Sequence, residues 1–454
     1  MILPIVCCSS SIVALVLSVT LLPSITIKVS TKCSFDVPTF WISSLLGLGL
    51  LLLTGTETFT TIGTLLCSQS VNPLSIIVLF FSLSFISIYL GKTGFFESVS
   101  IYVLSRVKSS PKSFFITSYI LVSFATLFTS NDVVILVLTP FIYHYTHNAG
   151  YPPLPYLIAQ FFSANIWSAL FYIGNPTNLY LAAYFDLDFA TYLKSSFITV
   201  IFAGILNFVM LYRLSRTTLK RKPVDLPSID SLAVEVDRPG VVIGCAHLII
   251  TIVFLIVGPY FSLDSSLVCF VGACSLLLCL IIRAVFSDFK FSAIFDVFAV
   301  LPWSVAPFLL SMFVQTLSLD KYQVTDRVAE LIEHVNIGKG VWHEVGDIFL
   351  YGILSVIMVN LMNNLPMTLF FASVISIQKV FSPVSVFAVA FGSNIGANLT
   401  PIGSLAGVMF CQILEKLSLK ITFKNFLGFG IRVSLVVVLC SLVVLSFHHV
   451  FGQF

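Results

Sequence analysis

Long apolar runs alternate with short polar stretches along nearly the whole chain. Charge-free runs cover residues 37–56, 58–90, 113–131 and 133–185, and then 239–263, 265–282, 297–319, 348–378, 380–414 and 433–454. A helix needs about 20 apolar residues to cross a bilayer, and several runs are long enough for two passes. The pattern therefore predicts an all-α polytopic membrane protein with roughly 10 to 12 transmembrane segments and shorter re-entrant pieces.

The composition agrees with this class and narrows the function. Hydrophobic residues make up 58% of the 454 and charged residues only 9%, and the net charge of +3 gives no sign of a nucleic-acid partner. The ten cysteines form no CxxC and no Cys/His spacing typical of a metal site, and the chain has no HExxH, GxSxG or GxxxxGK[ST] motif. We therefore expect no cofactor, no metal and no enzymatic activity.

One polar stretch divides the chain into two hydrophobic halves. Residues 213–238 hold a cluster of basic side chains and two prolines, Pro223 and Pro227, and Pro239 follows directly, which is typical of a solvated linker. The positive-inside rule places such a basic loop in the cytoplasm. We divide the chain into N-terminal membrane segments (1–71), a first transport repeat (72–212), the linker (213–238) and a second transport repeat (239–454).

Each half carries two polar interruptions in its apolar runs. The first half has them at residues 129–132 and 174–178, and the second half at 362–366 and 392–404. Paired interruptions at corresponding positions of two hydrophobic halves indicate the binding site of a secondary transporter. The candidate substrate-binding residues are Ser130, Asn131, Asn175, Thr177, Asn178, Asn363, Asn364, Asn394, Gly396, Asn398, Thr400, Gly403 and Ser404.

Asp132 is the candidate for ion or proton coupling. It is the only carboxylate between Ser98 and Phe185, and an ionisable residue at membrane depth is costly unless it has a function. The alternative is that Asp132 only caps a helix that begins there and runs to about Tyr145.

At these segments the sequence resembles the arsenite efflux permeases of the ArsB type, within the ArsB/NhaD ion transporter superfamily. The resemblance extends from about Asn72 to the C-terminus. Its marks include Asn131-Asp132, residues 175–178, residues 362–366, and Asn394-Ile395-Gly396 leading into residues 400–406. It implies two inverted repeats, each with a re-entrant helical hairpin and a broken helix. It also implies ion-gradient-coupled efflux of arsenite, antimonite or a similar small oxyacid, and hence arsenical resistance, with a soluble ATPase subunit as a possible partner.

The substrate stays open at this point. Ala397, Asn398 and Leu399 stand where the ArsB pattern has an acidic and a basic residue, and residues 174–178 are closer to other members of the superfamily. A sodium/proton antiporter or a carrier of silicate, phosphate or dicarboxylate is the alternative, although no Arg or Lys lies near the motifs. An intramembrane enzyme would need a second carboxylate, for which Asp296 is the nearest candidate, and a channel fits the paired broken helices less well than alternating access.

Overall fold

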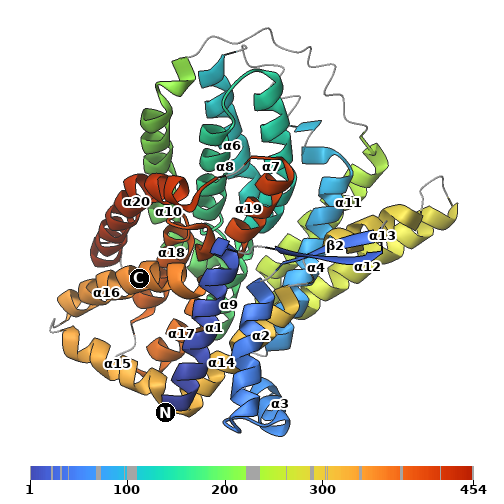
Figure 1. Ribbon diagram of the computed structural model, residues 1–454. Coiled ribbons are helices and arrows are strands. Elements are labelled where there is room, and N and C mark those ends of the chain that lie inside the picture. The colour runs from blue at the N-terminus through green and yellow to red at the C-terminus, as the bar shows by residue number, and fades with distance from the viewer. Residues whose placement is uncertain are drawn as a thin grey trace.

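The protein is a helical bundle with a small β-hairpin near its N-terminus (Figure 1). The computed structural model describes residues 2–21, 24–30, 33–38, 40–67, 73–96, 98–99, 110–220, 236–261, 263–286, 291–301, 303, 305–336, 340–378, 382–419 and 421–451. Within these ranges, eight helical stretches are long and apolar enough to span a membrane. Shorter apolar helices accompany them, so the predicted all-α polytopic membrane fold is confirmed.

The N-terminal part forms a separate layer against α14. It consists of α1 (Ile2–Leu21), β1 (Ser24–Ser30), β2 (Cys33–Pro38), α2 (Phe40–Leu53) and α3 (Phe59–Cys67). The two strands pair antiparallel, with Ile27 opposite Phe35. The hairpin is a small addition to the predicted helical fold, and residues 37 and 38 at the start of the apolar run 37–56 belong to β2.

Helices α6, α7 and α8 of the first repeat lie at the top of the view in Figure 1. Its elements are α4 (Pro73–Lys92), α6 (Pro111–Phe128), α7 (Asn131–Asn148), α8 (Leu154–Trp167), η1 (Tyr172–Gly174), α9 (Pro176–Tyr184) and α10 (Phe189–Ser215). Helix α10 extends three residues beyond the boundary predicted at residue 212, and η2 (Thr218–Lys220) lies within the predicted linker. The predicted helix boundary at residues 129–132 is confirmed, since α6 ends and α7 begins there.

The second repeat begins after the polar linker, of which residues 221–235 lie outside the described part of the chain. Its elements are α11 (Arg238–Val257), η4 (Gly258–Phe261), α12 (Ser265–Phe286), α13 (Phe291–Val300), α14 (Val305–Lys321), α15 (Val324–Val335), α16 (Val341–Met362), α17 (Asn364–Ile377), α18 (Pro383–Gly396), η5 (Pro401–Gly403), α19 (Leu405–Lys416) and α20 (Phe423–Phe451).

An ion pair fixes the end of the linker against the bundle. Asp237 caps α11, and the Arg283 guanidinium of α12 donates to both of its carboxylate oxygens at 2.6 Å. The Asp237 N–H also donates to the Thr93 carbonyl, 3.1 Å away, just beyond α4. The Arg283 guanidinium lowers the pKa of Asp237, so this carboxylate keeps its charge in mildly acidic solution. The ends of α4, α11 and α12 are thereby held at one level.

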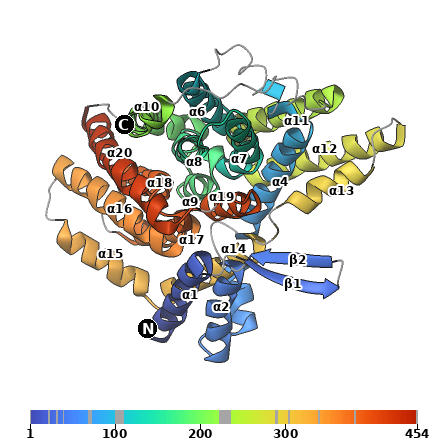
Figure 2. The same ribbon diagram turned by 45° about the horizontal axis from the view of Figure 1, so that its top comes forward.

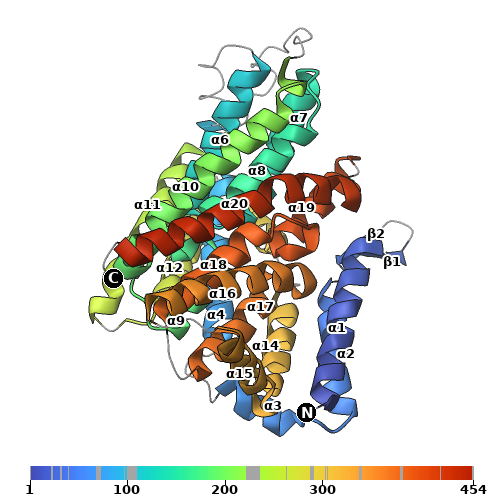
Figure 3. The same ribbon diagram turned by 90° about the vertical axis from the view of Figure 1, so that its left-hand side faces the viewer.

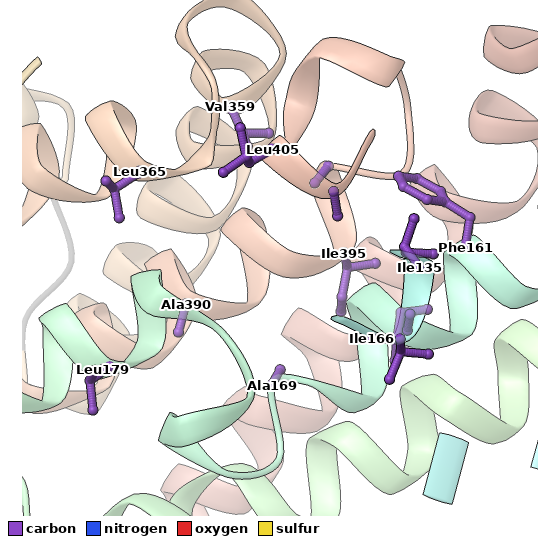
Figure 4. Close-up of a cluster of buried hydrophobic side chains, with 14 of the residues drawn as sticks. Ile135, Phe161, Ile166, Ala169, Leu179, Val359, Leu365, Ala390, Ile395 and Leu405 are labelled. Atoms are coloured by element: carbon purple, nitrogen blue, oxygen red, sulfur yellow. The ribbon is translucent and has the colours of Figure 1, made fainter. Parts of the chain in front are cut away.

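The two repeats pack together around a shared apolar core. Helix α10 of the first lies along α20 of the second (Figure 2), and α8 packs on α18. The core contains side chains from both repeats, such as Ile166 and Leu179 from one and Ile395 and Leu405 from the other (Figure 4). A side view separates the α1–α2 layer from the α6–α10 helices (Figure 3).

Candidate functional site

The first hairpin tip lies between α6 and α7. Ser130 is the N-cap of α7 and its hydroxyl accepts from the Val133 N–H, 3.4 Å away. Asp132 is therefore in the first helical turn and is not the capping residue. Its side chain is buried, and no hydrogen bond or ion pair to its carboxylate is found within the described ranges. The cap of α7 is thus provided by Ser130, so the Asp132 carboxylate is free to serve another purpose than capping.

The first broken helix consists of α8, η1 and α9. Asn175 ends η1 and caps α9, since its side-chain oxygen accepts from the Thr177 N–H at 3.2 Å. Pro176 occupies the first position of α9, where a missing N–H costs nothing. The sequence Gly-Asn-Pro-Thr thus stops one helix and starts the next in the middle of the bundle.

The second hairpin tip lies between α16 and α17. Asn363 joins the two helices with φ of +77°, a left-handed conformation that asparagine tolerates better than most residues. Its amide nitrogen donates to the Ile402 carbonyl of the second broken helix, 2.8 Å away. Asn364 then begins α17 and is also buried.

The second broken helix repeats the first in length and spacing. Helices α8 and α18 both have 14 residues. The starts of α8, η1 and α9 precede those of α18, η5 and α19 by the same 229 residues, from 154 to 383, 172 to 401 and 176 to 405. The N-caps Asn175 and Ser404 occupy matching positions. The two halves therefore share one structural unit, although their sequences differ.

A small cavity lies where these four segments meet. Its volume is about 20 Å³, room for roughly one water molecule. Five of the predicted site residues line it, and apolar side chains of α4, α14, α17 and α19 with Pro176 complete the wall. The lining residues are Asp132, Asn175, Thr177, Asn363, Asn364, Phe80, Pro176, Val305, Phe308, Leu309, Leu365 and Leu405.

The cavity lies at the N-terminal ends of five helices. Its lining includes residues of the first turn of α7, α9, α14, α17 and α19, namely Asp132, Thr177, Val305, Asn364 and Leu405. Helix N-termini carry a partial positive charge and free N–H groups, which attract oxygen atoms and anions. The described lining contains no Lys or Arg, so these backbone ends and Asp132 set the local potential.

Buried amides beside the cavity join the two repeats. The Asn394 side-chain oxygen accepts from Asn175 at 2.9 Å and from Ser168 at 3.1 Å, and its nitrogen donates to the Asn178 oxygen at 2.6 Å. Asn165, at the matching position of the first repeat, donates to the Asn398 oxygen at 2.8 Å. Each repeat therefore inserts one asparagine into the broken segment of the other.

The remaining predicted residues support this arrangement without lining the cavity. Asn131 donates to Asn165 at 2.8 Å, and the Thr400 hydroxyl donates to Asn360 at 2.7 Å. The Gly396 carbonyl accepts from Asn360, and the Ser404 hydroxyl caps α19. The structure thus divides the sequence-predicted set into five cavity residues and a group that holds the broken helices together.

Two kinds of site residue could not be recognised from local motifs: the polar pair Asn165 and Ser168, and the apolar lining of the cavity. Asn165 and Ser168 lie inside an apolar run and belong to no obvious motif, but the spacing of Asn165-Ile166 to Gly174 equals that of Asn394-Ile395 to Gly403. This internal match could have identified Asn165. Apolar cavity residues such as Phe80 and Phe308 carry no local signal, because they look like any other core residue.

Gly403 is expected to tolerate no side chain. A Cβ there would lie 2.7 Å from the Ala397 Cα, which is backbone and cannot move aside. We expect Gly403→Ala to destabilise the fold by roughly 1–3 kcal/mol and to abolish transport, because overpacking forces the broken segment to shift. Thermal unfolding of the purified protein checks this. Gly428→Ala on α20 is the control, since its Cβ would meet nothing within 4 Å. Equal melting temperatures of the two variants would contradict the expectation.

Comparison with protein families places the chain. The family model described as citrate transporter matches residues 8–380. The chain belongs to the citrate transporter family. It is therefore an integral multi-pass membrane transporter, and the eight spanning stretches agree with this conclusion.

The chain is also similar in sequence to individual bacterial membrane proteins. The chain is 27% identical over 376 residues to an arsenical pump membrane protein of Escherichia coli, covering 81% of this chain and 85% of the other. It is 24% identical over 371 residues to a 46 kDa membrane protein of Mycobacterium leprae, covering 80% and 83%. The resemblance to arsenite permeases is thus confirmed at the level of sequence.

The fold is also similar to that of a solved transporter. The YdaH transporter of Alcanivorax borkumensis aligns with a TM-score of 0.56 at 16% identity, covering 99% of this chain and 98% of the other. At this identity the likeness concerns the fold alone.

Proposed function

We propose that the chain exports a small oxyacid, with arsenite and antimonite as the first candidates, in exchange for a proton carried by Asp132. The observation that carries the proposal is the cavity, which combines five helix N-termini, neutral amides, the Thr177 hydroxyl and one carboxylate. Arsenite in its neutral form presents three hydroxyl groups, which suit amide and hydroxyl partners such as Asn175, Asn364 and Thr177.

The proposal assigns a proton to Asp132 for electrostatic reasons. A buried carboxylate without a cationic partner gains much from protonation, and its environment changes when the site opens to water. A change of protonation between the two states is what proton exchange requires. The name of the Escherichia coli relative, an arsenical pump membrane protein, supports arsenite as the substrate to test first.

Larger or more highly charged anions fit the site less well. Citrate carries several carboxylates, whereas the cavity is small and already contains Asp132, with no basic side chain in its described lining. Sodium/proton exchange and the transport of silicate, phosphate or dicarboxylates are the alternatives within the same fold. These alternatives predict a different driving ion or a different transported solute, both of which a flux assay measures.

The test is arsenite flux in everted vesicles that contain the protein. With an acidic interior, we expect proton exit to drive arsenite accumulation, and an imposed sodium gradient should have no effect. Vesicles without the protein are the control, and citrate and phosphate are measured in parallel. Sodium-driven uptake, or flux of citrate or phosphate without arsenite, would contradict the proposal.

A further inference from the structure

A second and larger hollow lies between α4 and α7. Its volume is about 590 Å³, and we refer to it as the α4–α7 crevice. Its walls come from α4 and α7, with Val300 at the end of α13. Most of the wall is apolar, but Lys92, His144 and Asn148 also line it. Lys92 and His144 are both exposed.

The crevice and the central cavity share two elements, α4 and α7. On α7 the cavity is lined by Asp132 and the crevice by Leu136, the next residue on that face of the helix. On α4 the cavity is lined by Phe80 and the crevice by Ile88. Four residues of helix rise by about 6 Å, so a single turn of α7 separates the crevice from the Asp132 position.

Helix α7 has one backbone carbonyl without its usual intrahelical hydrogen bond in the part that lines the crevice. Pro140 lies inside α7 and has no N–H, so the Leu136 carbonyl lacks its usual intrahelical donor. Both residues line the crevice. A backbone carbonyl at membrane depth is tolerated when it faces protein or water. Its position therefore favours water in the crevice over lipid.

The outer end of the crevice lies on the side of the linker. Lys92 is the last residue of α4, and the carbonyl of the following residue, Thr93, accepts from the N–H of Asp237 at the end of the linker. The exposed Lys92 thus lies at the level of Asp237, the N-cap of α11. On the positive-inside rule this is the cytoplasmic side.

We propose that the α4–α7 crevice is the aqueous vestibule through which solute and proton reach the central cavity from the linker side, with Leu136 as the barrier and Lys92 as an attractor of anions. That solute enters the crevice from the cytoplasm rests on the proposed export function. That the crevice is hydrated and positively charged does not rest on this function, and this part can be tested without any substrate.

The test uses charged thiol reagents that do not cross membranes. Phe141→Cys and, as a second position, Val137→Cys place a thiol on the crevice wall. Ile120→Cys on α6 is the matched control, because Ile120 is 60% exposed but lies in the middle of a spanning helix. Since the thiolate is the reacting form, labelling requires water. Peptide mass spectrometry of the full-length protein in sealed vesicles reads each site separately.

We expect labelling of the crevice thiols from the same side as Thr217→Cys near the linker, and no labelling of the control thiol. An anionic sulfonate reagent should react roughly tenfold faster than a cationic trimethylammonium reagent of similar size, because Lys92 is nearby. Lys92→Gln should remove this preference. Lys112→Gln, on the first turn of α6 and outside the crevice, should leave it unchanged.

Three outcomes would overturn the proposal. Crevice thiols as unreactive as the Ile120→Cys thiol would mean that lipid fills the crevice. Labelling from the side opposite to Thr217→Cys would place the opening on the wrong face. A charge preference that survives Lys92→Gln would exclude Lys92 as its source. None of these results depends on which solute is carried, so they are distinguishable from a failure to find arsenite flux.

Discussion

Replacing Asp132 by asparagine should abolish proton-driven accumulation of the substrate. Asparagine keeps the size and polarity of the side chain but cannot carry a proton between the two states. One proton moved across 100 mV is worth about 2.3 kcal/mol, which corresponds to an accumulation of about 50-fold. We expect this to fall to equilibration in Asp132→Asn, measured as the internal-to-external substrate ratio in energised vesicles.

The control for this variant is Asp186→Asn, the next carboxylate along the chain. Asp186 is exposed and has φ of +52°, a conformation that asparagine adopts readily. Its removal should leave accumulation unchanged. Undiminished proton-driven accumulation in Asp132→Asn would exclude Asp132 as the coupling residue. Loss of accumulation in both variants would indicate a general effect of the lost negative charge.

Asn394→Ala should be among the most destabilising single substitutions in the protein. The Asn394 side chain is fully enclosed and joins Asn175, Ser168 and Asn178 of the other repeat. Truncation leaves these partners buried without it, at about 1–3 kcal/mol for each unsatisfied group. We expect a loss of roughly 3 kcal/mol or more, measured as thermal or denaturant-induced unfolding of the purified protein.

The exposed Asn425 on α20 offers a matched substitution. Asn425→Ala removes the same atoms from the surface and should change the free energy of unfolding by no more than about 0.5 kcal/mol. If the Asn394→Ala and Asn425→Ala variants have the same melting temperature, the buried amides between the two repeats do not contribute to the stability of the protein.

The sequence was informative wherever a backbone break requires particular residues. Ser130-Asn131 at the first tip, Asn175-Pro176 at the first break and Asn363 at the second tip are all helix ends in the structure. These residue types are needed because a helix end leaves N–H and C=O groups unpaired, and in a membrane only neighbouring protein or water can satisfy them. The presence of a site between two hydrophobic halves followed from the same reasoning.

The sequence was less informative about which residues face the cavity. The segment from Gly392 to Ser404 is the richest in polar groups, yet apolar Leu405 directly after it is the cavity residue, while Asn394 and Asn398 hold the first repeat. Composition cannot distinguish an amide that meets a ligand from one that meets another amide. The β1–β2 hairpin was also missed, since its seven- and six-residue strands lie between long apolar runs.

The amides that link the repeats have a consequence for how the protein is made. Asn175 and its partner Asn394 are 219 residues apart in the chain. At a synthesis rate of about 5–20 residues per second, the first repeat waits roughly 10–45 seconds before its partner leaves the ribosome. During that time Asn175 and Asn178 must stay hydrated or be shielded by the insertion machinery. The two halves are therefore completed together, late in synthesis, and a chain that stops at the linker would leave its most polar surface uncovered inside the membrane.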